Sequence, residues 1–179
     1  MTDLKGKHFA LCGLFLALLA ISSKIQIPTP LVPFTLQTAT LLLCLLLLPN
    51  FLPFFTVGIY LFSGILGLPV FAQGGGFNYL LNPTFGYLLG FLVCAFIKGL
   101  FYKIQTSYKS GALFCALCIL IIHAIGALYA FLIYNQHLSA NLSPFYSFIF
   151  SSAIFIPSDL AWCALCPLLS NKISKAIKL

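Results

Sequence analysis

The sequence predicts an all-α integral membrane protein, a single-domain six-helix transmembrane bundle over residues 1–179. Hydrophobic residues make up 61% of the chain and charged residues only 6%, a balance that a soluble domain cannot present to water without large apolar patches. The apolar residues form long runs, and the basic residues lie in small groups at the ends of these runs. This pattern is typical of a multi-pass protein of the cell membrane.

Six apolar segments are candidates for membrane-spanning helices, since a bilayer core needs roughly 20 apolar residues per helix. They cover residues 8–23, 34–48, 51–67, 84–103, 111–134 and 146–169. The first segment also has features of a signal peptide, but such a peptide precedes a soluble exported body, so we retain this segment as a span. The second and third segments are short, and together they form either two spans or a re-entrant hairpin buried against its neighbours.

The nine basic residues are all lysines, and they fall unequally on the two sides of the predicted membrane. Only Lys24 lies on the outer side, so the positive-inside rule places the N and C termini in the cytoplasm and the loops at 24–33, 68–83 and 135–145 outside. The lysines do not line one basic face with interleaved aromatics, which argues against a nucleic-acid partner despite the net charge of +7. Eight lysines lie on the cytoplasmic side: Lys5, Lys7, Lys98, Lys103, Lys109, Lys172, Lys175 and Lys178.

Motifs for nucleotide or metal binding are missing from the sequence. No G-x-x-x-x-G-K-[ST] phosphate loop occurs, and we interpret the glycine run at 74–76 as a flexible hinge in an outward loop. Two C-x-x-C pairs, Cys115/Cys118 and Cys163/Cys166, lie inside apolar segments, where a thiol serves as a small apolar side chain. We therefore expect no cofactor and no metal site.

Polar side chains at membrane depth are costly to bury and are therefore the default candidates for a binding site. Asp159 is the only acid after residue 3 and lies about midway along the sixth segment; alternatively, its carboxylate fixes helix packing. His123 lies at a similar depth in the fifth segment, where it is either a partner of Asp159 or a packed core residue. Five further candidates lie on the outward side or within a few turns of it: Gln37, Gln73, Asn78, Tyr79 and Asn82.

The polar loop "KIQIPTPLVPFTLQ" at 24–37 separates the first two segments and contains three prolines. Proline fixes its own φ and restricts the preceding residue to extended geometry, so this loop can hold one shape without paired backbone. Together with the glycine-rich second outer loop, and with Asp159 beneath, it predicts an outward-facing pocket. Such a pocket is apolar and aromatic with a few aimed polar groups, as small-molecule sites usually are.

Three separated motifs stand out: "KIQIPTPLVPFTLQ", "GLPVFAQGGGFNYLLNPTFGYLLGF" at 67–91 and "FIPSDLAW" at 155–162. In order and spacing they resemble the BioY family, the substrate-binding S components of energy-coupling-factor (ECF) biotin transporters. The resemblance covers most of the chain and implies an S component of the bacterial cytoplasmic membrane that binds biotin from outside and is not an enzyme. It also implies partners, a transmembrane coupling subunit and two ATPases, in agreement with the missing nucleotide motif.

Biotin carries a ureido ring with two N–H donors and one carbonyl acceptor, for which an ionised Asp159 is a suitable partner. Three residues later the family usually has lysine, but this chain has Trp162 on the same helix face, which offers a stacking surface. Lys24 is either a cation for the carboxylate tail of biotin or an interfacial lysine that extends toward water. Because of Trp162, an S component for another small vitamin is the alternative to biotin, and a membrane enzyme using Asp159 and His123 is a less favoured third.

Small side chains recur along the first segment and lie on one stripe of the expected helix. Small residues let a second helix approach closely in a bilayer, where packing drives association. The stripe packs either against the protein's own helices or, as the resemblance implies, against the coupling subunit. Its members are Ala10, Gly13, Ala17 and Ala20.

Overall fold

The computed structural model describes residues 2–27, 32–101, 107–136, 143–152 and 155–177, and within these ranges the chain is largely helical. Two of the three prolines of the loop at 24–37, Pro28 and Pro30, lie outside these ranges, as do Lys103 and Lys178. The elements in chain order are α1 (Thr2–Lys24), β1 (Gln26–Ile27), β2 (Phe34–Thr35), α2 (Gln37–Leu47), α3 (Leu52–Ile65), η1 (Phe77–Leu81), α4 (Phe85–Leu100), α5 (Tyr108–Gln136), α6 (Pro144–Ser151) and α7 (Ile156–Ile177).

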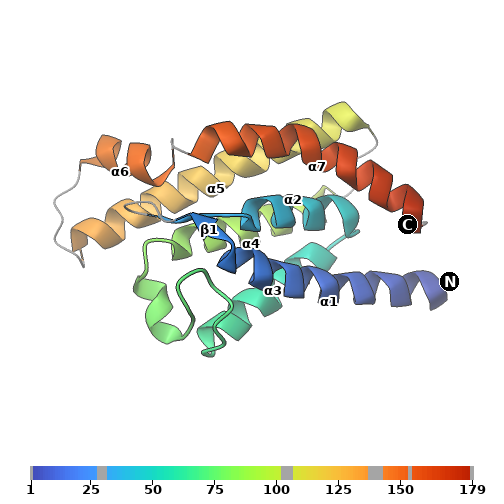
Figure 1. The fold of residues 1–179 in the computed structure, drawn as a ribbon, viewed down its shortest axis with the longest axis horizontal. Coiled ribbons are helices and arrows are strands. Elements are labelled where there is room, and N and C mark those ends of the chain that lie inside the picture. The colour runs from blue at the N-terminus through green and yellow to red at the C-terminus, as the bar shows by residue number, and fades with distance from the viewer. Residues whose placement is uncertain (1, 28–31, 102–106, 137–142, 153–154, 178–179) are drawn as a thin grey trace.

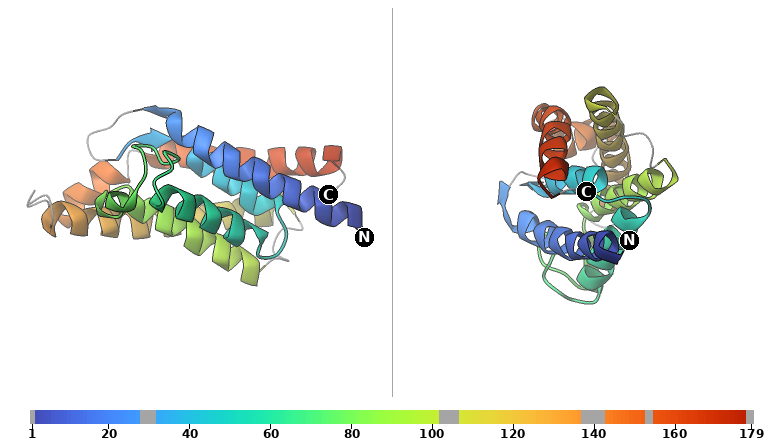
Figure 2. Two further views of the ribbon diagram at one scale, coloured as in Figure 1. Left: turned by 90° about the horizontal axis from the view of Figure 1, so that it is seen from below. Right: turned by 90° about the vertical axis from the view of Figure 1, so that its right-hand side faces the viewer.

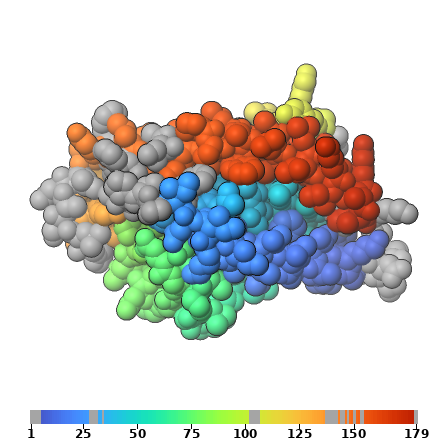
Figure 3. Space-filling model, viewed as in Figure 1, coloured from blue at the N-terminus to red at the C-terminus, as the bar shows by residue number. Residues whose placement is uncertain are grey.

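The helices run along one long axis and form an elongated bundle, with both ends of the chain at the same end of it (Figures 1 and 2). Helix α5 packs against α4 on one side and α7 on the other, while α2 packs against α7 and α1. Figure 3 shows α7 along the upper edge of one face of the molecule and α1 below it, with α2 visible between them. Helix α5 also begins at the end where the termini lie, so Lys109 lies at the same end of the bundle as Lys7 and Lys175.

Two helices in the described part of the chain have the length and apolar composition needed to cross a membrane, over Gly6–Lys24 and Tyr108–Gln136. Helices α2, α3 and α4 are apolar but have only 11, 14 and 16 residues. At 1.5 Å per residue, α2 is about 16 Å long, well short of the hydrocarbon thickness. Large apolar side chains such as Phe62, Leu113 and Leu120 are exposed on the outside of the bundle, as expected for a lipid-facing surface.

The predicted sixth span, 146–169, is not continuous. Helix α6 ends at Ser151 and α7 begins at Ile156, so Asp159 lies in the first turn of α7 rather than midway along a helix. Pro157 explains the start of α7. Proline has no backbone N–H to donate, and in the first turn of a helix that N–H would have no acceptor within the helix; its fixed φ also suits a helix start. The apolar pattern continues across the break, and for this reason it gave no sign of the interruption.

The loop between α1 and α2 is paired at its base, contrary to the expectation of an unpaired extended loop. Strands β1 and β2 are antiparallel, with Gln26 opposite Thr35 and Ile27 opposite Phe34. The second predicted segment therefore starts as a strand, and its helix begins only at Gln37. This short hairpin delivers Thr35 and Gln37 to one end of the bundle's interior.

The glycine run at 74–76 forms a tight, hydrogen-bonded turn, so its interpretation as a flexible hinge is wrong. Phe71 and Gly74 exchange backbone hydrogen bonds of 2.9 and 3.2 Å, and the Gly76 amide donates to the Gly64 carbonyl at 2.7 Å. A Cβ at Gly75 would lie 2.1 Å from the Leu68 carbonyl oxygen, so only glycine fits there. The turn places the Phe71 ring inside the core, directly over Gly64.

The C-x-x-C cysteines contribute to the hydrophobic core, as expected for thiols in apolar segments. Cys115, Cys118, Cys163 and Cys166 are all buried and belong to one cluster with apolar side chains of α2, α3 and α4. The Cys166 thiol lies 3.7 Å from the Ala39 carbonyl oxygen, and this contact joins α7 to α2. These side chains pack the helices that surround the cavity described next.

Candidate functional site

A cavity of about 580 Å³, counting the part open to solvent, lies between the β-hairpin, the turn before α4, and helices α2, α4, α5 and α7. Its wall is mostly apolar and aromatic, with hydroxyl, amide, imidazole and carboxylate groups at separate points. This composition is that of a site for a small organic molecule. The lining residues are Val32, Pro33, Thr35, Gln37, Thr38, Ala72, Tyr79, Thr84, Tyr87, Leu88, Phe91, Ile122, His123, Phe155 and Asp159.

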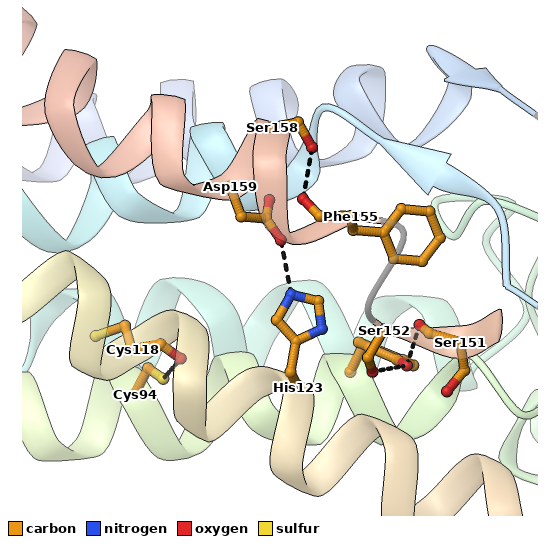
Figure 4. A network of polar contacts seen from close by, with 9 residues as sticks. Cys94, Cys118, His123, Ser151, Ser152, Phe155, Ser158 and Asp159 are labelled. Atoms are coloured by element: carbon orange, nitrogen blue, oxygen red, sulfur yellow. Dashed lines mark hydrogen bonds and ion pairs between the residues drawn. The ribbon is translucent and has the colours of Figure 1, made fainter. Parts of the chain in front are cut away.

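A buried imidazole–carboxylate pair joins α5 to α7 at this cavity. His123 Nε2 lies 2.7 Å from Asp159 Oδ2, and the two side chains are only 9% and 5% exposed (Figure 4). His123 Nδ1 is buried and has no hydrogen-bond partner in the described part of the chain. The pair was predicted from the similar depth of the two residues, and the structure brings them into contact.

The position of Asp159 in the first turn of α7 helps to accommodate its carboxylate away from water. Unpaired amides give the first turn of a helix a partial positive charge, which stabilises a nearby anion. One residue earlier, the Ser158 hydroxyl donates to the Phe155 carbonyl at 2.7 Å and ties the helix start to the break before it (Figure 4). Asp159 thus lines the cavity from the first turn of α7, just after the break between α6 and α7.

Tyr87 of α4 links the cavity wall to the break between α6 and α7. Its hydroxyl donates to the Ser151 carbonyl and lies 2.8 Å from the Ser152 hydroxyl. Its ring meets the His123 ring edge to face, with centroids 6.0 Å apart. Tyr87 was not among the predicted site residues, although it is the tyrosine of "GYLLGF" in the second quoted motif and a polar-tipped side chain in an apolar segment.

Gln37 is held in a chain of hydrogen bonds at the hairpin end of the cavity. Its amide nitrogen donates to the Tyr60 hydroxyl at 2.6 Å, and that hydroxyl donates to the Val70 carbonyl at 2.9 Å. The Thr35 hydroxyl donates to the side-chain amide oxygen of Gln37, Oε1, at 3.3 Å. These contacts fix the orientation of the amide, so Gln37 presents a fixed polar group to a ligand.

A second polar group surrounds Thr84, at the start of α4. The Thr84 hydroxyl lies 2.8 Å from both the Tyr79 hydroxyl and the side-chain oxygen Oδ1 of Asn82. The side-chain nitrogen Nδ2 of Asn82 donates in turn to Oε1 of Gln73 at 2.6 Å. Tyr79 and Thr84 reach the cavity, whereas Asn82 and Gln73 support them from the segment between α3 and α4.

Lys24 and Trp162 lie outside the cavity wall. The Lys24 ammonium donates to the Phe71 carbonyl at 2.6 Å, next to the lining residue Ala72. Trp162 is half-buried and packs against the core cluster. Four predicted site residues line the cavity, namely Gln37, Tyr79, His123 and Asp159, whereas Lys24, Gln73, Asn78, Asn82 and Trp162 do not.

A comparison with known protein families identifies the family of this chain. The model of the BioY family matches residues 1–179. The chain belongs to the BioY family. The three quoted motifs that carried the resemblance supply most of the cavity lining of this BioY protein, including the hairpin, the turn before α4 and the first turn of α7.

Relatives of this BioY protein match over most of their length. A probable biotin transporter BioY of Lysinibacillus sphaericus is 33% identical over 168 residues, which cover 93% of this chain and 86% of that protein. A biotin transporter BioY of Rhodobacter capsulatus is 31% identical over 179 residues, with 94% of each chain covered. The crystal structure of the S-component for biotin from an ECF-type ABC transporter superposes with a TM-score of 0.83 at 24% identity, covering 98% of this chain and 94% of that chain. That structure shares the fold.

The small-residue stripe of this BioY protein divides into an exposed part and a packed part. Ala10, Gly13 and Ala17 are exposed, and a Cβ added at Gly13 would meet no atom within 4 Å. Ala20 is half-buried and packs against the core cluster. Only the last member of the stripe is therefore used for packing within the described chain.

Proposed function

We propose that this BioY protein binds biotin from the outer side of the bacterial cytoplasmic membrane and takes part in its uptake as the substrate-specific component of an ECF transporter. The observation that carries the proposal is a buried carboxylate, Asp159, at a mostly apolar cavity. The relatives named biotin transporters support the choice of ligand. One domain over residues 1–179 contains the whole binding function.

The chemistry of biotin suits the cavity. A ureido N–H group of biotin donates to Asp159, and a hydrogen bond to an ionised acceptor is about twice as strong as a neutral one. The ureido carbonyl accepts from one of the fixed polar groups in the wall, Gln37, Tyr79 or Thr84. The apolar ring system packs on Leu88, Phe91 and Ile122, which line the same cavity.

The valerate tail of biotin points toward the outer loops. Its carboxylate needs a cation or water, and the lining residues in the described part of the chain include no lysine. Lys24 lies close to the edge of the cavity, since its ammonium donates to the carbonyl of Phe71, and the next residue, Ala72, lines the cavity. We place the tail carboxylate near Lys24, with Gln73, Asn78 and Asn82 on the outer-loop side and Trp162 as packing behind the site.

The orientation follows from the lysines and the fold together. Both termini and the start of α5 lie at one end of the bundle, where Lys7, Lys109 and Lys175 also lie. The cavity is lined by the hairpin and the turn before α4, which belong to the predicted outer loops. We therefore assign the end with the termini to the cytoplasm and the cavity to the outer half of the bilayer.

The exposed part of the stripe on α1 serves as a docking surface for the coupling subunit. Ala10, Gly13 and Ala17 present a surface without bulky side chains, along which another transmembrane helix can approach closely. Ala20 anchors the outer end of α1 to the core. The two ATPases drive transport through the coupling subunit.

A calorimetric titration of the purified protein with biotin, riboflavin and thiamin tests the choice of ligand. We expect saturable binding of biotin alone, accompanied by a rise in thermal stability, because a ligand that binds only the folded state stabilises it by mass action. Binding of another vitamin in place of biotin would favour the alternative function, an S component for a different small vitamin, which was considered because Trp162 replaces the usual lysine of the family. Binding of none of them would refute the proposal.

A further inference from the structure

The cavity holds one buried ring nitrogen whose hydrogen-bonding partner is missing from the described residues. The His123 side chain is 91% buried, and Nε2 is bonded to Asp159, but Nδ1 has no partner there. Buried polar atoms in proteins are almost always bonded to protein, ordered water or ligand. Nδ1 therefore marks a place where a group from outside the described chain is expected to bind.

The contact with Asp159 determines which kind of group that is. A carboxylate that bonds one imidazole nitrogen holds the proton on that nitrogen, so Nε2–H donates to Oδ2. In the neutral imidazole, the other nitrogen, Nδ1, then carries a lone pair and acts as an acceptor. The partner of Nδ1 is accordingly an N–H or O–H donor.

We infer that His123 is a ligand-contacting residue of this site, and that its Nδ1 accepts a hydrogen bond from a ureido N–H of the ligand. The inference rests on the proposed function, because it assumes a ligand with a cyclic urea. A cyclic urea carries two N–H donors, and the pair presents acceptors on two residues: Asp159 through Oδ1, and His123 through Nδ1. Each donor of the ring thus has an acceptor, with no lysine among the described lining residues.

Access to Nδ1 involves the break between α6 and α7. Figure 4 shows the Nδ1 side of the His123 ring facing the region of Phe155 and Ser152. Nδ1 is covered in this structure, so a ligand reaches it after the neighbouring side chains shift. Phe155 lies at the break and lines the cavity, so a shift of its ring opens the cavity toward Nδ1.

A purely structural His123, which only orients Asp159, is the competing interpretation, and His123→Gln separates the two. The side-chain amide nitrogen of glutamine lies near the place of the histidine Nε2 and can still donate to Asp159, but glutamine has no acceptor at the place of Nδ1. The matched control is His8→Gln, the same exchange on α1 outside the cavity lining. Biotin methylated on one ureido nitrogen is the complementary probe, because it lacks one of the two donors.

Titration calorimetry with biotin is the first measurement. We expect His123→Gln to bind about tenfold more weakly than wild type, the effect of one lost hydrogen bond, and His8→Gln to bind as wild type does. We expect biotin methylated on the ureido nitrogen that faces Nδ1 to bind wild type more weakly than biotin does. The His123→Gln protein should bind the methylated and the unmethylated biotin with nearly the same affinity. Full affinity in His123→Gln overturns the inference alone, whereas a wild-type protein that binds no biotin refutes the proposed function.

Nitrogen NMR of the wild-type protein is the second measurement, and it reports the state of the His123 ring directly rather than through an affinity. The chain has three histidines, so a protein labelled with ¹⁵N-histidine gives few ring signals, and His123→Gln identifies those of His123. We expect the Nδ1 signal to be that of an unprotonated nitrogen and to shift when biotin saturates the site, while Nε2 stays protonated. An Nδ1 signal that biotin leaves unchanged would overturn the inference, even where His123→Gln weakens binding, and would make His123 a positioning residue.

Discussion

His123 on α5 and Asp159 on α7 are 36 residues apart in the sequence, yet their side chains meet at 2.7 Å beside the cavity. The contact fastens two helices that form neighbouring parts of the cavity wall. It also places the single carboxylate of the described lining at the first turn of α7. In the proposed function, the same pair of residues would therefore serve both ligand binding and the packing of α5 against α7.

Replacing Asp159 with asparagine should weaken biotin binding about tenfold while the protein stays folded. Asparagine has the same shape, but its neutral amide oxygen accepts hydrogen bonds about half as strong as those of a carboxylate. Titration calorimetry measures the affinity, and the unfolding temperature of the ligand-free protein reports folding. Wild-type affinity in a folded Asp159→Asn protein would make the carboxylate a structural residue and remove the basis of the site.

Replacing Tyr87 with phenylalanine should loosen the break between α6 and α7 and thereby weaken biotin binding. The change removes the hydroxyl that contacts Ser151 and Ser152, both fully buried, and such a loss costs about 1–3 kcal/mol. Unfolding temperature and biotin affinity should both fall. Tyr108→Phe is the matched control, since its exposed hydroxyl makes only a 3.4 Å contact with the Ala164 carbonyl; equal effects in both variants would contradict the role assigned to Tyr87.

A methyl group at Gly64 should destabilise the fold through the outer turn. A Cβ there would lie 2.1 Å from the end of the Phe71 ring, which is fully buried, and overpacking of this kind costs about 1–3 kcal/mol. Gly58→Ala on the same helix is the control, because a Cβ at Gly58 meets no atom within 4 Å. We expect a lower unfolding temperature for Gly64→Ala only, and equal stability of the two variants would show that Phe71 moves aside freely.

The general architecture could be predicted from the sequence because it depends on composition and on the lengths of apolar runs. Hydrophobic periodicity does not report where a helix stops when both sides of the break are apolar, so the interruption before Asp159 was missed. Pro157 was visible, but proline is as compatible with a kinked helix as with a helix start. The pairing of β1 with β2 involves only two residues in each strand, too few for a periodic pattern.

The residues that line the cavity were predicted only in part. A physical reason separates the lining residues that the sequence indicated from those that it did not. His123 and Asp159 were found because ionisable groups are rare and expensive inside apolar segments. Tyr87 and Thr84 were missed because a hydroxyl is common in apolar helices, and only the fold shows which hydroxyls face the cavity. Trp162 was expected at the site from its spacing to Asp159, but it packs against the core, since two residues three apart on a helix need not face the same neighbour.

Reporter fusions should place both ends of the chain in the cytoplasm. Eight of nine lysines lie on the side that we assign to the cytoplasm, and such asymmetry orients bacterial membrane proteins. Alkaline phosphatase, which is active only outside, should be inactive when fused after residue 106 or residue 179, and active when fused after residue 140. Activity at residue 106 or 179 would reverse the topology and put the cavity on the wrong side for uptake.

Replacing Ala17 with leucine should separate biotin binding from transport. Ala17 is exposed on α1 and lies outside the cavity lining, so a larger side chain there leaves the pocket untouched. On the docking surface of Ala10, Gly13 and Ala17, it would hold the helix of a coupling subunit away, because close approach in a bilayer depends on small side chains. We expect the isolated Ala17→Leu protein to bind biotin as wild type does, but to lose copurification with the coupling subunit and ATP-dependent uptake.

The matched control for this last change is Ala161→Leu, which adds the same side chain at an exposed position of α7 outside the cavity lining. It should leave both binding and uptake unchanged, because the proposed docking surface is confined to α1. Loss of biotin binding in Ala17→Leu would mean that the stripe supports the protein's own packing, as Ala20 does. Normal uptake by Ala17→Leu would mean that the coupling subunit docks on another face, and the exposed small residues of α1 would then face lipid alone.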